Sequence, residues 1–269
     1  MIESAANPLI KRIRALGQRK GREQAGACFV EGIQAVWQAV DAGATIETLI
    51  VAPDLLTSVA AREMVARQQA AGIAVAEVSA SVYERIATRE NPSGLAAIIP
   101  IPISITPRDL ASLVVTPTSL FVALHDIGNP GNLGTILRTV DAVGGSGAIL
   151  IGDTTDPYHP NAVKASVGTL FRLPIVQTDR IADVMEWSRA HGISVVTTSA
   201  RATQEHWQVV YPSPLLMLFG NEGRGLPREI VERGDLAVQI PMHGSASSLN
   251  LAVAAGVLLY EALRQRSSQ

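Results

Sequence analysis

The sequence predicts an α/β protein of two domains. Apolar runs of strand length alternate with helical patterns along the chain, as in α/β folds. A proline-rich stretch, PIPISITPRD at 100–109, interrupts this alternation. Proline breaks helices and fits poorly in central strands. We therefore expect one domain over residues 1–105 and a second over residues 106–269.

The first domain has the pattern of a small α/β unit. In its first predicted helix, Leu9, Ile13 and Leu16 share one face and basic residues occupy the other. Short apolar runs and helical segments then alternate. The predicted helices are 8–20, 32–42, 55–71 and 79–88, and the predicted strands are 27–31, 46–51, 73–78 and 95–101.

The second domain has the pattern of an open parallel sheet. Its apolar runs lack strict alternation, which is typical of strands buried on both faces. Ligands bind such sheets outside the carboxyl ends of the strands. The predicted strands are 119–124, 148–152, 193–198, 215–219 and 236–240, and the predicted helices are 132–143, 160–168, 180–191, 226–233 and 248–265.

Several function classes are excluded by the composition. Cys28 is the only cysteine, so neither an intrachain disulfide nor a CxxC metal site is possible. The five histidines show no metal-ligand spacing. No apolar run reaches the length of a membrane span, and the N-terminus lacks the apolar core of a secretory signal. We expect a cytoplasmic protein with no metal and no membrane partner.

Positive charge gathers at the N-terminus although the net charge is −2. Residues 1–22 contain six basic side chains against one acidic side chain, Glu3. Such a cluster is either the electrostatic footprint of an RNA-binding surface or one effect of an arginine-rich composition. The candidate RNA-binding residues are Lys11, Arg12, Arg14, Arg19, Lys20 and Arg22.

A Gly/Asn-rich segment, HDIGNPGNLGTILRT at 125–139, follows the strand at 119–124. The helix that it opens buries Leu133, Ile136, Leu137 and Val140, whereas Arg138 leaves that face. Arg138 either points into the crevice of the loop or is a surface residue after an ordinary Asn/Gly turn.

Two further segments follow predicted strands. In LFGNEGRGLP at 218–227 the glycines permit close backbone approach to a ligand. Glu222 either holds a cation or ligand hydroxyl there or caps a helix. The segment matches neither a P-loop nor the GxGxxG fingerprint. In IPMHGSASSLN at 240–250, Ser247 or Ser248 is expected to cap the last helix.

Taken in order, three motifs resemble those of the SpoU (TrmH-type) RNA ribose 2′-O-methyltransferases of the SPOUT superfamily. They are N-P-G-N-L-G-T-I-L-R-T, L-F-G-N-E-G-R-G-L and I-P-M-x-G-x-x-x-S-L-N-L-A-V-A, and the resemblance covers about residues 118–266. N-P-L-I-K-R-I-R-A-L and F-V-E-G-I-Q-A-V are similar to the L7Ae/L30e-like substrate-binding domain that is often fused to this catalytic domain.

The resemblance implies a SPOUT-type open parallel sheet with a C-terminal trefoil knot, an exception to the rule against knots. It implies a homodimer whose active site lies near the interface. The expected reaction is methyl transfer from S-adenosylmethionine to a ribose 2′-hydroxyl of structured RNA. A two-domain chain favours 23S ribosomal RNA over transfer RNA. The alternative is a non-catalytic RNA-binding or ribosome-assembly protein, favoured only by Ala252, where the family often has serine.

The resemblance also assigns roles by matched position. Cofactor contacts fall on Gly220, Ile240 and Leu249, with Leu218, Asn221 and Met242 beside them. The polar catalytic set is Asn132, Arg138, Glu222 and Asn250. A guanidinium stays protonated and makes a poor base, so Arg138 is expected to activate the ribose hydroxyl by binding an adjacent phosphate.

Overall fold

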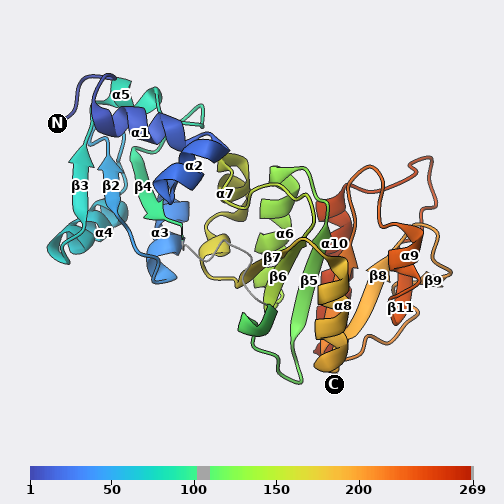
Figure 1. Cartoon of the computed structure of the whole chain (residues 1–269). Helices are drawn as coiled ribbons and strands as arrows, with labels where there is room; N and C mark the ends of the chain where they lie inside the picture. The colour runs from blue at the N-terminus through green and yellow to red at the C-terminus, as the bar shows by residue number, and fades with distance from the viewer. Residues whose placement is uncertain (102–109, 268–269) are drawn as a thin grey trace. The chain divides into compact units, whose positions relative to one another are not determined.

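The structure is a computed structural model that describes residues 1–101 and 110–267. The described residues form two compact units (Figure 1). The first contains residues 1–101 and 156–172, and the second contains residues 110–155 and 173–267. The expected boundary between residues 105 and 106, with most of the proline-rich stretch, lies outside the described residues.

The first unit is built on a four-stranded mixed sheet in the order β1-β4-β2-β3. β4 runs antiparallel to β1 and β2, and β2 runs parallel to β3. The strands are β1 (Ala27–Glu31), β2 (Thr48–Val51), β3 (Ala74–Glu77) and β4 (Leu95–Pro100). The helices are α1 (Pro8–Leu16), α2 (Arg19–Ala25), α3 (Ile33–Asp41), α4 (Val59–Ala70), α5 (Ala80–Glu84), α7 (Pro160–Ser166) and the 3-10 turn η3 (Thr169–Phe171).

The single helix expected over 8–20 is two helices. α1 ends before Gly17, and α2 starts at Arg19. A side chain on Gly21 would collide with the backbone of Ala15, so a glycine permits the close approach of the two helices. The apolar face of α1 is buried as expected, with Ile10, Ile13 and Leu16 almost inaccessible.

Residues 156–172 belong to the first unit, so the expectation that they are part of the second domain is wrong. Here α7 packs against β1, and η3 packs against α3. A side chain on Gly168 would meet Ala35 and Gln38 of α3. The first unit is therefore assembled from two separate stretches of chain.

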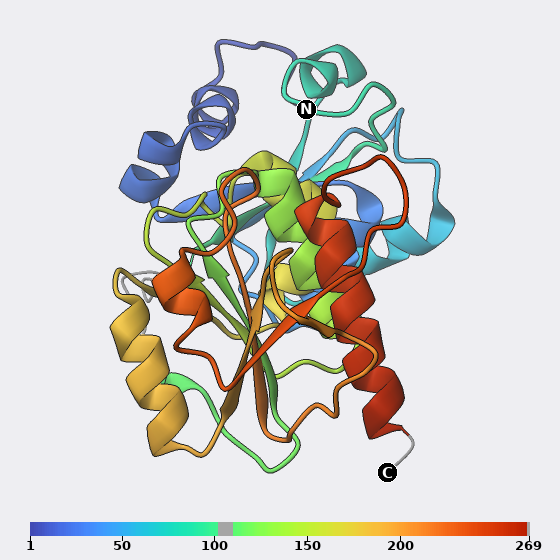
Figure 2. The same ribbon diagram turned by 90° about the vertical axis from the view of Figure 1, so that its right-hand side faces the viewer.

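The second unit is a seven-stranded, fully parallel sheet in the order β7-β6-β5-β10-β8-β11-β9. Figure 2 shows α8 and α9 on one side of this sheet and α6 and α10 on the other. The strands are β5 (Leu120–His125), β6 (Gly147–Ile151), β7 (Ile175–Thr178), β8 (Ser194–Thr198), β9 (Gln204–Glu205), β10 (Leu215–Phe219) and β11 (Leu236–Gln239). The helices are η2 (Leu110–Ser112), α6 (Pro130–Ala142), α8 (Ile181–Ala190), α9 (Arg228–Val231) and α10 (Leu251–Arg266).

The open parallel sheet confirms the expected fold class. The central strands β5, β6 and β10 are buried along almost their whole length, because helices cover both faces. β7 and β9 were not predicted. The trefoil knot stays a prediction. Within the described residues, no helix is long and apolar enough to cross a membrane.

Candidate active site

Three loops of the second unit form the candidate site, and each leaves the carboxyl end of a parallel strand. The first joins β5 to α6, the second follows β10, and the third joins β11 to α10. β5 and β10 are neighbours in the sheet, so their loops emerge side by side. The carboxyl edge is where open parallel sheets bind ligands. All three motif segments of the sequence thus reach the expected edge.

Asn132 lies at the centre of a polar chain that joins the three loops. Its amide nitrogen donates to Glu222 Oε1 at 3.2 Å, and its Oδ1 accepts a hydrogen bond from Asn250 Nδ2 at 3.0 Å. Asn132 is 9% exposed. It is placed there because α6 begins at Pro130, with Asn129 accepting hydrogen bonds from the amides of its first turn. Three of the four residues of the predicted catalytic set are therefore bonded to one another.

Glu222 fixes the first loop against the second. Its Oε2 accepts a hydrogen bond from the Gly128 amide at 3.1 Å, and its Oε1 accepts one from the Asn129 amide at 3.0 Å. Burial raises the pKa of Glu222, but these bonds, with those from its own amide and Asn132, outweigh burial and lower the pKa below its usual value. Glu222 is thus an anion at neutral pH that holds loop amides at the start of α6.

The N-terminus of α10 is capped by Asn250, so the expectation of a Ser247 or Ser248 cap is wrong. Asn250 Oδ1 accepts hydrogen bonds from the amides of Ala252 at 2.9 Å and Val253 at 3.3 Å. The helix begins at Leu251, which places both serines in the preceding loop, too early to cap it. Asn250 therefore caps α10 with its oxygen and bonds Asn132 with its nitrogen.

A cavity of about 900 Å³ lies between the loops that follow β8, β10 and β11. Most of the predicted cofactor residues line it, and so does Glu222. These lining residues are Gly220, Asn221, Ile240, Met242 and Leu249, joined by Ser247 and Ser248. The volume lies in the range of small-molecule and cofactor sites.

The second loop is shaped by Gly220 and Asn221. A side chain on Gly220 would collide with the backbone of Gly225, so only glycine permits the loop to fold back there. Asn221 Oδ1 accepts hydrogen bonds from the Gly223 and Arg224 amides, while its Nδ2 donates to the Asp126 carbonyl at 2.8 Å. Asn221 therefore shapes its own loop and ties it to the first.

Two predicted site residues lie apart from this arrangement. Leu218 is fully buried inside β10, in the apolar core, and does not line the cavity. Arg138 is exposed on α6, and no described residue accepts a hydrogen bond from its guanidinium. Arg138 thus presents a positive charge at the surface that has no partner among the described residues.

One wall of the cavity was not predicted from the sequence. Residues 198–203, which follow β8, line it, as do residues 234–239 in and before β11. The segment has no glycine-rich motif, and its only signal is that it follows a predicted buried strand. No cluster of metal-ligating side chains is present within the described ranges.

The predicted RNA-binding residues lie in the first unit and differ in availability. Arg12 forms a bidentate ion pair with Glu47, and Arg19 pairs with Glu23 on the surface. Arg22 is 1% exposed and bonded inside the protein, so we do not retain it as an RNA-binding residue. The exposed cations of α1 and α2 that have no partner among the described residues are Lys11, Arg14 and Lys20.

Parallel strands that bring three polar loops around a cofactor-sized cavity define a ligand-binding α/β protein. The family comparison is specific. The model of the SpoU rRNA Methylase family matches residues 119–260, and that of the MRM3-like substrate binding domain matches residues 7–97. The chain belongs to the SpoU rRNA methylase family.

Relatives match over nearly the whole chain. The 23S rRNA (uridine(2479)-2′-O)-methyltransferase of Streptomyces viridochromogenes is 35% identical over 259 residues, covering 94% of this chain and 88% of that protein. The 23S rRNA (guanosine(2553)-2′-O)-methyltransferase RlmP of Bacillus subtilis is 27% identical over 260 residues, covering 96% of this chain and 97% of that protein.

A solved structure also matches over nearly the whole chain. The crystal structure of an AdoMet-bound rRNA methyltransferase from Sinorhizobium meliloti aligns with a TM-score of 0.85 and 37% identity. The alignment covers 98% of this chain and 97% of that chain. The similarity thus includes both units and not only the motif-bearing sheet.

Proposed function

We propose that this protein transfers a methyl group from S-adenosylmethionine to a ribose 2′-hydroxyl of 23S ribosomal RNA. The observation that carries the proposal is the bonded chain Glu222–Asn132–Asn250, which joins three family motifs beside one cavity. Two relatives with 23S rRNA in their names match nearly the full chain but are named for different nucleosides. The proposal therefore names the RNA and the ribose hydroxyl, and not the base.

The cavity fits the cofactor. Ile240, Met242 and Leu249 supply apolar wall, and Gly220, Asn221 and Glu222 line the same cavity. Such a combination of apolar surface and a few polar groups is typical of cofactor sites. When bound, S-adenosylmethionine supplies an activated methyl group on a sulfonium, and the transfer needs an in-line approach of the ribose oxygen.

The polar chain positions the loops and does not move protons. Glu222 stays ionised, since its pKa is held below the usual value, and each of its oxygens already accepts loop donors. Asn250 donates to Asn132, and Asn132 in turn donates to Glu222, so both side-chain amides are held in place. Catalysis by this set is therefore mainly positioning, which can supply much of the rate of a displacement reaction.

Arg138 is the group proposed to act on the RNA. A guanidinium remains charged, so it binds a phosphate next to the target ribose and does not remove the proton itself. The hydroxyl proton passes to solvent water as the oxygen–methyl bond forms and the sulfur–methyl bond breaks. A fixed positive charge there lowers the cost of developing negative charge on the ribose oxygen. Arg138 is exposed and has no partner within the described ranges, which leaves it open to an RNA backbone.

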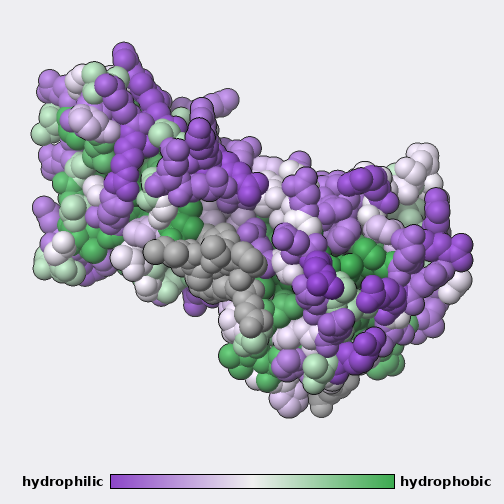
Figure 3. All heavy atoms as spheres, in the orientation of Figure 1, coloured by the Kyte–Doolittle hydropathy of each residue, from purple (hydrophilic) through white to green (hydrophobic). Residues whose placement is uncertain are grey.

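The RNA-binding surface is proposed to lie on α1 and α2. Figure 3 shows hydrophilic residues gathered over these helices. Lys11, Arg14 and Lys20 are exposed there, and Arg19 takes part only in a surface ion pair, which is weak enough to exchange for a phosphate. A cytoplasmic location follows from a ribosomal substrate.

A homodimer is proposed from α10. Exposed apolar side chains recur along it at Val253, Val257 and Tyr260, and Leu249 lies just before it; these side chains are 36–54% exposed. Contiguous apolar surface of this kind marks interaction sites. The stripe begins at Leu249, which also lines the cavity, so a second copy on this face would lie beside the cofactor site.

The test is methyl transfer from labelled S-adenosylmethionine to 23S and transfer RNA, with wild type and Arg138→Ala compared. We expect label on ribose of 23S rRNA, reduced at least about 100-fold in the variant, as for loss of a transition-state contact. Nuclease digestion separates ribose label from base label. Label on a base, or on transfer RNA alone, would contradict the proposal. Failure to bind S-adenosylmethionine by calorimetry would favour a non-catalytic protein.

A further inference from the structure

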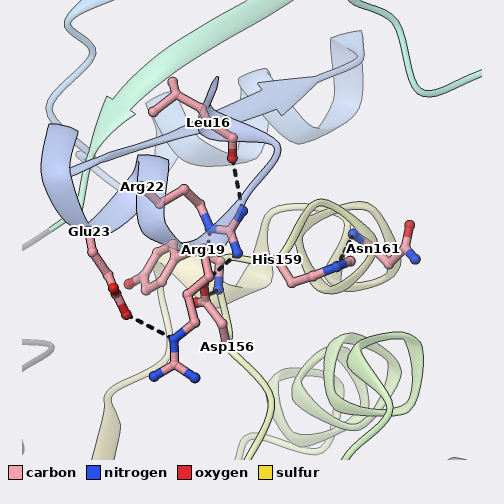
Figure 4. Close-up of polar contacts among 8 residues, drawn as sticks. Leu16, Arg19, Arg22, Glu23, Asp156, His159 and Asn161 are labelled. Carbon is pink, nitrogen blue, oxygen red and sulfur yellow. Dashed lines mark hydrogen bonds and ion pairs between the residues drawn. The ribbon is translucent and has the colours of Figure 1, made fainter. Parts of the chain in front are cut away.

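Arg22 holds Asp156 from a buried position in the first unit (Figure 4). The Arg22 Nε and Nη2 atoms donate to Asp156 Oδ2 at 2.9 and 2.6 Å, and Nη1 donates to the Leu16 carbonyl at 2.9 Å. Asp156 Oδ1 accepts a hydrogen bond from the Tyr158 amide at 2.7 Å. Both ends of the pair are thus fixed by further bonds, and a buried guanidinium cannot exchange its partner for water.

The residues just before Asp156 hold the first loop of the candidate site. In the second unit, the Asp153 amide donates to Asp126 Oδ1 at 3.0 Å, and the Thr155 amide donates to the Ile127 carbonyl at 2.8 Å. Asp126 has a φ of 54°, which is uncommon for a residue other than glycine and persists only where the surroundings enforce it. Residues 153–155 supply part of that enforcement, together with the Ile151 carbonyl and Asn221.

The same loop carries the donors that hold Glu222. The Gly128 and Asn129 amides come directly after Ile127. A displacement of Thr155 therefore reaches the bonded chain Glu222–Asn132–Asn250 through only a few residues. Glu222, Asn221 and residues 153–155 all hold this loop by hydrogen bonds.

Thr155 and Asp156 are joined by one peptide bond. Thr155 is bonded to the catalytic loop, and Asp156 is bonded to the helix pair that carries the proposed RNA-binding cations. We propose that Asp156, held by Arg22, is a positioning residue that couples RNA bound on α1 and α2 to the geometry of loop 126–129. The proposal rests on the proposed function, which supplies the RNA.

The experiment separates the bond of Thr155 to loop 126–129 from the bond of Asp156 to Arg22 without breaking either. Two glycines inserted between Thr155 and Asp156 in the full chain leave both sets of hydrogen bonds able to form. The matched control has the same insertion after Gly192, in an exposed turn between α8 and β8. Single-turnover methylation of a full-length 23S rRNA transcript is measured with saturating S-adenosylmethionine, alongside the dissociation constants of both ligands.

We expect the 155/156 insertion to slow methyl transfer about tenfold or more, because small misplacements of reacting groups are costly. Binding of S-adenosylmethionine and of the transcript should stay within about twofold of wild type, and the control should keep its rate. A rate that the insertion leaves within about twofold of wild type, or one that the control loses equally, would overturn the proposal.

Amide hydrogen exchange gives a readout that does not depend on turnover. The transcript should slow exchange in residues 126–129 of wild type and leave it unchanged in the insertion variant. An equal effect in both proteins would overturn the coupling, even if the transcript proves not to be methylated. If the insertion impairs folding, Arg22→Met with Asp156→Asn replaces the buried pair without an orphan charge, and the same loss of coupling is expected.

Discussion

At Glu222, one carboxylate accepts two loop amides and one side-chain amide, and its low pKa follows from those donors. Replacing Glu222 by glutamine removes the charge and turns one acceptor into a donor facing other donors. We expect a loss of about 1 kcal/mol of unfolding free energy at pH 7, at the low end for bonds to a charged group because the residue is exposed. Chemical denaturation of both proteins measures it.

The pH dependence of that loss has a definite sign. Because folding lowers the pKa of Glu222, the ionised form stabilises the native state above the usual glutamate pKa of about 4.3, and the effect fades as pH falls through the native pKa. The gap between wild type and Glu222→Gln should shrink in acid. Glu232→Gln, in a surface ion pair, is the control and should change little at any pH. A gap independent of pH would contradict this account.

Asn250 shows what sequence reasoning can and cannot supply at one residue. Its motif position indicated a role in the site, whereas the cap was assigned to Ser247 or Ser248 by residue type. All three are good capping residues, and the choice depends on where the helix begins. Because α10 begins at Leu251, the capping residue is Asn250.

The cap at the N-terminus of α10 can be tested by mutation. Asn250→Ala should cost about 1 kcal/mol of stability through the lost cap, and should also weaken S-adenosylmethionine binding because Asn132 loses a donor. Calorimetry and thermal unfolding measure the two effects. Ser248→Ala removes a hydroxyl from the preceding loop and should change stability by less than about 0.5 kcal/mol. Equal losses in the two variants would argue against the cap.

The other end of α10 depends on Glu261. Its pKa is lowered to about 2, first by the hydrogen bond from Arg264 and also by that from Gln265. Gln265 in turn bonds Val209 and Tyr211, which fastens the helix to the loop after β9. Wild type should therefore be more stable than Glu261→Gln at neutral pH, and the difference in melting temperature should narrow below the usual glutamate pKa and vanish near pH 2. A constant difference would count against the ion pair as its source.

Strands were predictable where their two faces are buried. β5, β6 and β10 are continuous apolar runs, because both of their faces are buried in the sheet. β7 has one fully buried residue, Val176, and β9 is two polar residues long, so neither has an apolar run to find. Such edge strands are placed by pairing with neighbours and not by their own composition.

For the whole molecule, the α10 stripe predicts the oligomeric state. Light scattering should give twice the chain mass of 28.4 kDa. Val253→Asp with Tyr260→Asp should shift the protein toward monomer and lower methyl transfer, because charges would be buried against a second copy. Val114→Asp, at an exposed apolar residue elsewhere, should leave the mass unchanged. A wild-type monomer would refute the dimer.

The grouping of residues 156–172 with the first unit could not be found from local patterns. The Arg22–Asp156 pair joins positions 134 residues apart, and neither residue belongs to a motif. In the sequence, Arg22 is one of six clustered cations and resembles the other five. Only burial distinguishes it, and burial of a charged side chain depends on a partner that the three-dimensional fold must supply.

The divided first unit has a consequence for how the protein is made. A ribosome releases the chain from its N-terminus at about 5–20 residues per second, and domains generally fold as they emerge. Here the N-terminal stretch waits for residues 156–172, which appear only after β5, α6 and β6 have been synthesised. Until then Arg22 has no Asp156 to neutralise it. The contacts of the first unit are therefore complete only partway through synthesis of the second, and a transfer of residues 1–101 alone to another protein would leave Arg22 without Asp156.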